Sequence, residues 1–492
     1  MKWKRAFLAL DFGTSNVHVT LVDGDTAEMI LGTSRKYRWY TPGPNEIELN
    51  AEEVWKASET AVEELMRKLP ENLELLAVTF SFFGDSITPV DKDGNALYAM
   101  LPGFCGRSRS EVELMDKEIG AQEYARITGN TLSTLSSVSK ILWLKRHRPE
   151  VFKKAYAFYS NQEYIMHRLG LPGVQDTTLA ARKLAYDVKG GHWSEPLLEL
   201  MGIPEAKLGT NIVESATAIG KISSYGSVKL PCELPVTIGC HDVSASLLST
   251  GVKLEHSDIL GVLMGTYEQI GYFSDTFVDG CNDFGDSLIF SCCYNSPFKG
   301  KYTVMDAFPT AGALLEWYCK YILQDEKADV GKLIANVPLD GENPLIFLPY
   351  AETFHGAVLG MGLGTTTDMI FESILESLAF QFVACVEYIR STRKEPFHRL
   401  HFGGGGSRSD KLLQLRADLI HAPVGRMDNI ELPSLGACML AGLGNGVYHD
   451  LDEAGKNMVK GVHYFEPQED NYKKYESKYR IYRKYSAAYL KV

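Results

Sequence analysis

The residues best suited to chemistry are two Gly-Thr pairs at hairpin turns and an aspartate between them in the sequence. Gly13 and Thr14 follow an apolar strand, and Gly265 and Thr266 follow another one 252 residues later. Backbone N–H groups of such turns converge on an anion, and small hydroxyl side chains add donors. Asp242 precedes the second pair. The pattern indicates phosphoryl transfer, which needs phosphate donors, a divalent cation and a group that orients or deprotonates the attacking hydroxyl.

Two aspartates at strand ends are the candidate acidic groups. Asp11 ends the first apolar strand two residues before Gly13, where its carboxylate would face bound phosphates. One carboxylate with several waters commonly holds Mg²⁺ beside a nucleotide, so the apolar strand favours a metal role over an ordinary turn aspartate. Asp242 ends a short strand and precedes small residues that start a helix. It would accept the proton of a sugar hydroxyl, and an N-cap aspartate is the alternative of nearly equal weight.

Two further segments suit nucleotide and sugar binding. Residues 403–407, GGGGS, form a Gly-rich turn into a helix N-terminus, which suits a nucleotide but also serves as a flexible turn. Asp85, in SFFGDS, is a candidate ligand for sugar hydroxyls, with an exposed turn aspartate as the equally weighted alternative. The sequence has no GxxxxGK[ST] pattern, which excludes a P-loop enzyme.

Two hairpins built on one plan must position these residues. Residues 7–25 read as strand, Gly-Thr turn and alternating strand, and residues 259–275 repeat that order. Two unrelated glycine turns are the alternative. Alternation of helix-like and strand-like segments predicts an α/β fold, with helices over 50–69, 368–390 and 407–421 and strands over 75–82, 235–239 and 400–402.

The bulk composition excludes several classes of partner. The 492 residues allow two to four domains at a prior of ~150 residues each. A net charge of −12 argues against nucleic acid and anionic membranes, and no run approaches the ~18 apolar residues of a membrane span. Nine scattered cysteines without CxxC spacing and an N-terminus without a signal peptide predict a cytosolic protein. The tyrosine-rich tail predicts a packed amphipathic helix rather than an RNA-binding one.

Taken in order, the motifs resemble the FGGY family of carbohydrate kinases, in the superfamily that includes actin and hexokinase. The resemblance spans essentially the whole chain and rests on LDFGTSN, GCHDVSAS, MGTYEQ, FPTAGALLEW, FGGGGSRSDKLLQLRADLIHAPV and LPSLGACMLAGLG. It implies an α/β fold of two ribonuclease-H-like, actin-like ATPase domains, residues 1–244 and 245–492, which close over a central cleft. Closure would exclude water and limit wasteful ATP hydrolysis.

The resemblance also implies roles at matching positions. Asp242 becomes the general base and Asp11 the acidic residue near Mg²⁺. The residues implied at ATP are Gly13, Thr14, Ser15, Asn16, Gly265 and Thr266 at the phosphates, Gly404 and Gly405 at the adenosine, and Gly312 near the nucleotide. The residues implied at the sugar are Asp85, Arg107, His241 and Asp242. The expected ligands are therefore ATP, Mg²⁺ and a small sugar, and a homodimer is left open.

The sugar side departs from the family pattern. His18 stands where relatives often carry Lys or Arg, and SFFGDS replaces a QMHG-like stretch. Gly103 and Cys105 replace a usual Trp and Asp, with Arg107 retained, and the loop after FLPY is shortened to AETFHG. The His-Asp pair and the FGD element resemble the rhamnulokinase and fuculokinase branches.

The sequence therefore predicts an ATP-dependent kinase that phosphorylates a hydroxyl of a ketose, deoxyketose or polyol. The altered sugar-side motifs keep a catalytically degenerate, sugar-sensing member as an alternative. An actin-like nucleotide-dependent binding protein is the other alternative, because it would share the hairpins and the Gly-rich turn.

Overall fold

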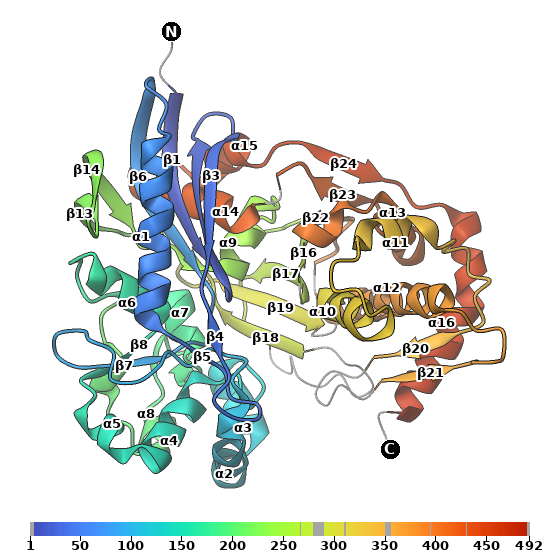
Figure 1. Ribbon diagram of the computed structural model, residues 1–492, viewed down its shortest axis with the longest axis horizontal. Helices are drawn as coiled ribbons and strands as arrows, with labels where there is room; N and C mark the ends of the chain where they lie inside the picture. Colours follow the sequence, from blue (N-terminus) through green and yellow to red (C-terminus); the bar gives the residue numbers. More distant parts are fainter. Residues whose placement is uncertain are drawn as a thin grey trace.

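The computed structural model describes residues 4–265, 267–278, 290–308, 311–349, 356–393, 395–429 and 431–489. Two large sheets dominate it, one from each half of the chain (Figure 1). The first sheet has, in spatial order, β13 (Ala218–Tyr225), β14 (Val228–Thr237), β6 (Leu73–Phe82), β1 (Lys4–Phe12), β2 (Asn16–Asp23) and β3 (Met29–Lys36), and β15 (Cys240–His241) pairs with β6. The second has β18 (Phe290–Asn295), β19 (Tyr302–Phe308), β17 (Glu268–Ser274), β16 (Ile259–Met264), β22 (Arg399–Gly403), β23 (Val424–Met427) and β24 (Val462–Phe465).

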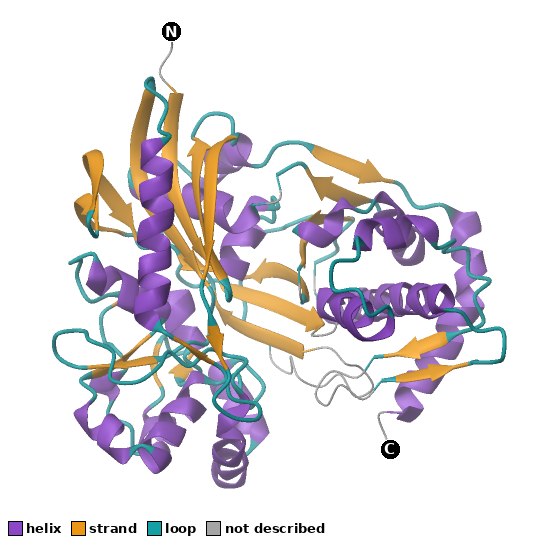
Figure 2. Ribbon diagram, in the orientation of Figure 1, coloured by secondary structure: helices purple, strands orange, loops and turns teal. Residues whose placement is uncertain are grey.

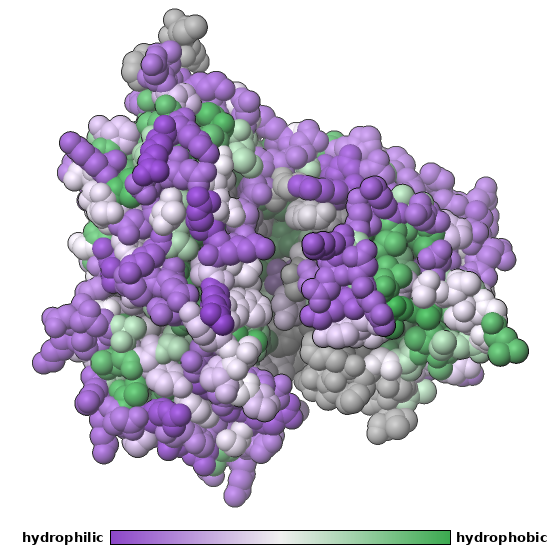
Figure 3. All heavy atoms as spheres, in the orientation of Figure 1, coloured by the Kyte–Doolittle hydropathy of each residue, from purple (hydrophilic) through white to green (hydrophobic). Residues whose placement is uncertain are grey.

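The two sheets share one pairing plan. In the first, β1, β2 and β3 form an antiparallel meander, while β6 runs parallel to β1 and β14 runs parallel to β6. In the second, β16, β17 and β19 form the meander, while β22 runs parallel to β16 and β23 parallel to β22. The predicted α/β fold with two ribonuclease-H-like units is confirmed. The space-filling view is hollowed along the line where the two parts meet (Figure 3).

Helices cover the sheets and build the lower part of the first half (Figure 2). The helices of the first half are α1 (Ala51–Arg67), α2 (Arg109–Ile119), α3 (Ala121–Thr128), α4 (Ser137–His147), α5 (Pro149–Lys154), α6 (Asn161–Arg168), α7 (Thr177–Arg182), α8 (Glu195–Met201) and α9 (Asp242–Ser249). Those of the second half are α10 (Ala311–Trp317), α11 (Val330–Asn336), α12 (Thr367–Thr392), α13 (Asp410–Ile420), α14 (Leu432–Gly444), α15 (Leu451–Met458) and α16 (Glu469–Tyr489).

Short elements connect the larger ones. Two-stranded ribbons pair β4 (Trp39–Tyr40) with β5 (Glu48–Leu49), β7 (Thr88–Val90) with β8 (Ala157–Tyr159), β9 (Gln175–Asp176) with β12 (Ile212–Val213), β10 (Tyr186–Asp187) with β11 (His192–Trp193), and β20 (Ile346–Leu348) with β21 (Ala357–Leu359). Short 3₁₀ helices lie at Gly106–Ser108, Glu205–Lys207 and Gly405–Arg408, and a π-helical turn lies at Tyr318–Ile322.

Local capping explains where the predicted helices begin. Helix α1 starts after Asn50, whose side chain accepts the N–H groups of Glu52 and Glu53 and so satisfies two of the free donors of the first turn. The helix predicted from residue 407 starts later, at α13, because Gly405–Arg408 forms a 3₁₀ turn and Ser409 caps the N–H of Leu412. Both predicted helices are confirmed, with shifted ends.

Helices α9 and α14 pack against each other where the two halves meet. Helix α14 also lies on β1 and β6, and the hydroxyl of Thr79 in β6 donates to the carbonyl of Ala437 at 3.1 Å. A Cβ on Gly436 would lie 1.8 Å from the carbonyl oxygen of Ala245, so only glycine permits this approach of the two backbones. A helix of the second half thus braces the helix that begins with Asp242.

Two long helices of the second half belong to its core. Helix α12 is long and apolar enough to cross a membrane, contrary to the expectation that no segment approaches such a span. Within the structure, however, 83% of its apolar window is buried, which marks a core helix. Helix α16 buries Tyr475 and Tyr482 against this core, and its Lys478 pairs with Glu376 of α12 at 2.5 Å. The predicted packing role of the tail is confirmed.

Candidate active site

The ends of three parallel strands gather the acidic residues of the first half. Asp11 on β1 lies in register with Ser81 on β6, and Ser81 lies in register with Cys240 on β15. Asp242 follows β15 directly and is the first residue of α9. Because ligands of α/β sheets bind at the carboxyl ends of parallel strands, this edge is where a substrate is expected.

Asp242 combines a half-open position with a strongly perturbed acidity. Its Oδ1 accepts the N–H of Val243 at 2.7 Å, and 28% of its side chain remains exposed. Burial raises the pKa of Asp242 to about 8, and the nearby carboxylates of Asp11 and Asp85 add to the rise, while Arg182 opposes it. A carboxyl group with such a pKa gains its ionised, proton-accepting form as the pH rises toward 8, and general bases are most effective when their pKa lies near the working pH.

Asp11 lies beneath the first hairpin turn. It is 8% exposed, and the hydroxyl of Ser81 donates to its Oδ1. Burial raises the pKa of Asp11 to about 6, against the lowering effects of the Ser81 hydrogen bond and of His18 across the hairpin. The only hydrogen bond that its side chain makes with the described residues comes from Ser81 and not from the turn N–H groups. The alternative of an ordinary turn aspartate is therefore not supported.

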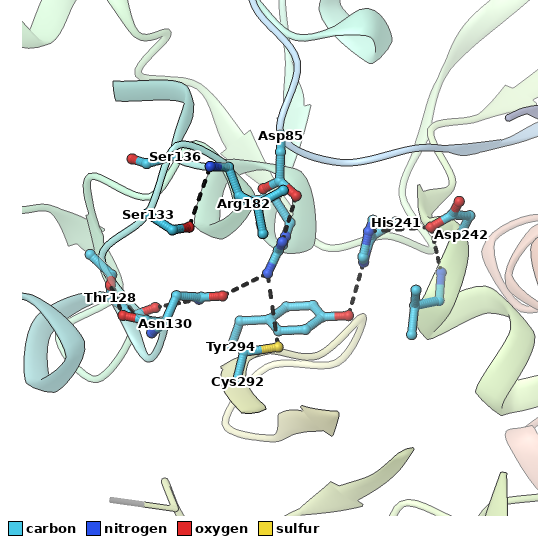
Figure 4. A network of polar contacts seen from close by, with 12 residues as sticks. Asp85, Thr128, Asn130, Ser133, Ser136, Arg182, His241, Asp242, Cys292 and Tyr294 are labelled. Carbon is cyan, nitrogen blue, oxygen red and sulfur yellow. Dashed lines mark hydrogen bonds and ion pairs between the residues drawn. The ribbon is translucent and has the colours of Figure 1, made fainter. Parts of the chain in front are cut away.

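Asp85 lies in a buried polar network beside Asp242 (Figure 4). Its backbone adopts φ +60°, a left-handed conformation that aspartate tolerates better than most residues. Its Oδ2 accepts from Arg182 at 2.5 Å, and the same guanidinium donates to Asn130 Oδ1 at 2.8 Å and lies over the ring of Tyr294. Among the described residues, Asp85 Oδ1 and Arg182 Nε are buried without a hydrogen-bond partner.

Aromatic side chains hold the first Gly-Thr turn. The hydroxyl of Tyr37 donates to the carbonyls of Gly13 and Asn16, and the indole N–H of Trp39 donates to the carbonyl of Thr14 at 2.9 Å. The carbonyl of Ser15 accepts the backbone N–H of Tyr37 at 3.1 Å. Because the carbonyls of residues 13–16 already accept hydrogen bonds from Tyr37 and Trp39, the remaining N–H groups of the turn can bind an anion.

The structure brings predicted nucleotide residues of the second half together. Gly312, at the start of α10, donates its N–H to the carbonyl of Gly265 at 3.3 Å. Gly404 has φ +86°, and a Cβ there would lie 2.6 Å from the carbonyl oxygen of Met264, so the Gly-rich turn packs against the end of β16. Gly405 has open space around its Cα. Thr266 lies outside the described residues.

Arg107 lies apart from the network around Asp85. Its guanidinium pairs with Glu48 at 2.8 Å and lies over the ring of Trp143. It also donates to the sulfur of Cys105 at 3.0 Å. None of the contacts recorded for Arg107 among the described residues reaches the acidic groups at the strand ends, and its role at the sugar stays a prediction.

Several residues of this site had no signal in the sequence. Arg182 ends α7, and Asn130 follows α3, so both lie far from Asp85 along the chain. Tyr37 and Trp39 follow the first hairpin without any motif of their own. A single arginine within the small-residue run TTLAAR was the one available hint, because a buried arginine in such a run needs a carboxylate partner.

The raised pKa of Asp242 predicts a pH-dependent cost to stability. Between its unfolded value near 3.8 and its folded value of about 8, the folded state retains a proton that the unfolded state has lost, so unfolding becomes easier as pH rises. We expect the free energy of unfolding of Asp242→Asn to rise relative to that of wild type by on the order of 1 to 3 kcal/mol between pH 5 and pH 8. Thermal unfolding at both pH values measures this.

The exposed carboxylate of Asp470 provides the control for that experiment. Its side chain is 97% exposed, so Asp470→Asn should leave the pH dependence of unfolding unchanged. If the stabilities of wild type and Asp242→Asn changed equally between pH 5 and pH 8, the raised pKa of Asp242 would be contradicted.

Mg²⁺ and ATP fit the residues that are present. No group of three or more His, Cys, Asp or Glu side chains suited to a metal gathers within the described part of the chain. A single carboxylate completed by waters and phosphate oxygens is nevertheless the usual ligation of Mg²⁺ beside a nucleotide, and Asp11 is the residue that would provide this carboxylate. The N–H groups of Gly13 and Gly265 donate to the carbonyls of Asn16 and Tyr267 within their own turns, so phosphate oxygens would be bound by neighbouring N–H groups of these turns.

Comparison with known proteins identifies the family. The N-terminal domain model of the FGGY family of carbohydrate kinases matches residues 6–249, and the C-terminal domain model matches residues 286–444. A xylulose kinase of Bacillus subtilis is 24% identical over 97% of this chain and 95% of its own length, and a glycerol kinase of Thermococcus gammatolerans is 26% identical over 99% and 97%. An L-fuculokinase of Escherichia coli is 26% identical over 80% and 82%.

Solved structures share the whole fold. A ligand-bound xylulose kinase from Lactobacillus acidophilus superposes with a TM-score of 0.85 at 21% identity, covering 98% of both chains. A gluconate kinase from the same organism also gives 0.85 at 21% identity, over 99% of both. The two domain models together match most of the sequence and do so in chain order, so this chain belongs to the FGGY family of carbohydrate kinases.

Proposed function

We propose that this carbohydrate kinase transfers the γ-phosphate of ATP to a hydroxyl of a neutral ketose, deoxyketose or polyol, with Asp242 as the general base. The observation that carries the proposal is the position of Asp242. Its partly exposed carboxylate lies at the carboxyl edge of the first sheet, close enough to Asp11 on one side and Asp85 on the other for both to raise its pKa.

The chemistry follows from that position. Asp242 takes the proton of the substrate hydroxyl while the freed oxygen attacks the γ-phosphorus in line, forming one P–O bond as the bond to ADP breaks. The products are a phosphorylated sugar, ADP and a proton, and no covalent enzyme intermediate forms. The turns at Gly13 and Gly265 supply N–H donors to the phosphates. Asp11 would hold Mg²⁺, which neutralises charge on the phosphate oxygens when bound.

The polar network beside Asp242 supports a neutral, hydroxyl-rich substrate. A hydroxyl both donates and accepts, and the buried Asp85 Oδ1 and Arg182 Nε offer one acceptor and one donor without a partner among the described residues. The positive charge of Arg182 is already matched by Asp85 at 2.5 Å. The other described cation near Asp85 is Lys140, whose buried Nζ donates to the carbonyls of Thr134, Leu135 and Ser136. Among the described residues, a substrate carboxylate would therefore meet Asp11, Asp85 and Asp242 while Arg182 and Lys140 already have hydrogen-bond partners.

The named relatives agree with this class of substrate. Xylulose kinase, glycerol kinase and L-fuculokinase carry names that specify uncharged polyhydroxy compounds. The gluconate kinase is 21% identical, and a similarity at this level is evidence for a shared fold and not for a shared substrate. We therefore expect this chain to discriminate against sugar acids.

A substrate panel tests the proposal. ADP release is measured with Mg²⁺, ATP and a set of ketoses, deoxyketoses, polyols and aldonates. At least one neutral compound should stimulate ADP release, and aldonates should leave it at the ATP-only rate. Stimulation by an aldonate alone would overturn the substrate class. Tight sugar binding in calorimetry without any ADP release would favour the sugar-sensing alternative over a kinase.

A further inference from the structure

A buried tyrosine of the second half contacts the histidine that precedes Asp242. The hydroxyl of Tyr294 lies 2.9 Å from Nδ1 of His241, and Nε2 of His241 lies 3.2 Å from Oδ1 of Asp242 (Figure 4). Tyr294 is fully buried and His241 is 5% exposed, so water does not compete for these contacts. The three side chains form a continuous chain from a hydroxyl through an imidazole to the carboxylate.

The protonation state of His241 determines how it interacts with Tyr294 and Asp242. Burial lowers the pKa of His241 well below its ordinary value, and the cation of Arg182 lowers it further, so the ring is neutral and carries one N–H. A proton on Nε2 faces Oδ1 of Asp242 at 3.2 Å and attracts the carboxylate, which leaves Nδ1 to accept the hydrogen bond of Tyr294. A proton on Nδ1 would instead turn the lone pair of Nε2 toward an ionised carboxylate. The first tautomer alone satisfies all three groups while Asp242 is ionised.

Tyr294 is itself held firmly from both halves of the chain. Its hydroxyl lies 3.2 Å from the hydroxyl of Ser244, which lies 3.1 Å from the hydroxyl of Thr303. Thr303 can therefore donate to Ser244 and Ser244 to Tyr294, while Tyr294 donates to His241. Its strand β18 hydrogen-bonds to the first half, because the N–H of Cys293 donates to the carbonyl of Gly129 at 2.8 Å. Gly129 has φ +65°, and a Cβ there would lie 1.7 Å from the carbonyl oxygen of Cys293.

We propose that Tyr294 is a positioning residue for phosphoryl transfer, which locks His241 in the Nε2–H tautomer so that its N–H faces Oδ1 of Asp242 and orients the carboxylate. The other carboxylate oxygen, Oδ2, then takes the proton of the substrate hydroxyl. Tyr294 and His241 keep their own protons throughout, so the only proton moved is the one that passes from substrate to Asp242. This inference rests on the proposed role of Asp242 as general base.

Tyr294 lies in the second half of the chain, whereas His241 and Asp242 lie in the first. Asp242 directly follows β15 of the first sheet, and Tyr294, which contacts its neighbouring histidine, lies on β18, an edge strand of the second sheet. The charged groups with the largest effects on the pKa of Asp242 are Asp11, Asp85 and Arg182, all from the first half. Tyr294 is thus the link by which the nucleotide-side half fixes the orientation of the base on the sugar-side half.

Tyr294→Phe is the primary test, because it removes the hydroxyl and keeps the ring that packs on Arg182. With a neutral substrate found by the panel, we expect kcat to fall about 10- to 100-fold, as for a general base set in the wrong orientation, with KM for both substrates within about threefold of wild type. A merely structural role would raise KM as well. Tyr225→Phe is the matched control, since Tyr225 is equally buried and its hydroxyl bonds to Ser58 at 2.8 Å.

A double-variant cycle separates orientation from general damage. Gln at position 241 places an amide N–H near the former Nε2 and does not need Tyr294, so His241→Gln with Tyr294→Phe should be no slower than His241→Gln alone. Nitrogen NMR of histidine-labelled protein above pH 8, where Asp242 is ionised, should show Nε2–H in wild type and a mixture in Tyr294→Phe, with the signal assigned by its loss in His241→Gln.

The outcomes distinguish this inference from the proposed function. A wild type that releases no ADP with any neutral compound refutes the proposed function. An active wild type with an equally active Tyr294→Phe variant, or with fully additive losses in the double variant, refutes the role of Tyr294. Loss of kcat at constant KM together with the altered histidine signal supports it.

Discussion

Asp242→Asn is expected to fold and bind ATP like wild type and to lose sugar-dependent ADP release by ~10² or more. The amide of Asn cannot accept a proton, whereas the carboxyl group of Asp242, with a pKa of about 8, accepts one in its ionised form, whose share grows as the pH approaches 8. The side chain keeps its size, so the packing of α9 and the N–H bond from Val243 can persist. Initial rates, circular dichroism and ATP titration by calorimetry measure the three properties.

A second buried aspartate provides the matched control for this experiment. Asp306 on β19 is 1% exposed, and burial raises its pKa to about 7, yet it lies in the second sheet and pairs there with Ile270 and Ser291. Asp306→Asn should therefore keep wild-type turnover. Comparable loss in both variants would mean that burial of a carboxylate, and not proton transfer at Asp242, explains the effect.

Gly436→Ala is expected to destabilise the protein by about 3 kcal/mol or more and to reduce turnover on the order of 10²-fold in the fraction that folds. The added methyl group would lie 1.8 Å from the carbonyl oxygen of Ala245, a backbone atom that cannot rotate away. Helix α9 must shift to accommodate it, and Asp242 is the first residue of that helix. Chemical denaturation measures the free energy of unfolding, and initial rates measure the loss of turnover caused by the displacement of Asp242.

Gly455 on α15 is the matched helical glycine. A Cβ there meets no atom within 4 Å, so Gly455→Ala should stabilise the protein by up to ~1 kcal/mol through the better helix propensity of alanine. Equal stability of the two variants would contradict the close approach of α9 and α14.

The sequence was most informative where function depends on short motifs at strand ends. The Gly-Thr turns, the Gly-rich turn and the Asp11 and Asp242 positions were predicted, because a strand followed by a turn places its last residues at one edge of a sheet. The paired topologies of the two sheets confirm the duplicated plan behind that prediction. The roles assigned to these residues remain predictions that the experiments above address.

The sequence was least informative where the site depends on pairs that are far apart along the chain. Arg182 and Asp85 are separated by 97 residues, and His241 and Tyr294 by 53. Tertiary packing alone brings them together, and no periodicity reports it. Arg107 illustrates the converse, because its local motif matched the family while its guanidinium pairs with Glu48 in the fold.

The most direct test of the account is transfer of label from γ-labelled ATP to the neutral sugar or polyol selected by the substrate panel, in a single turnover with enzyme in excess. We expect wild type to place the label on the substrate and Asp242→Asn to do so at least ~10² times more slowly, with ATP still bound. Label that appears only as inorganic phosphate in wild type, or equal transfer rates in the two proteins, would contradict it.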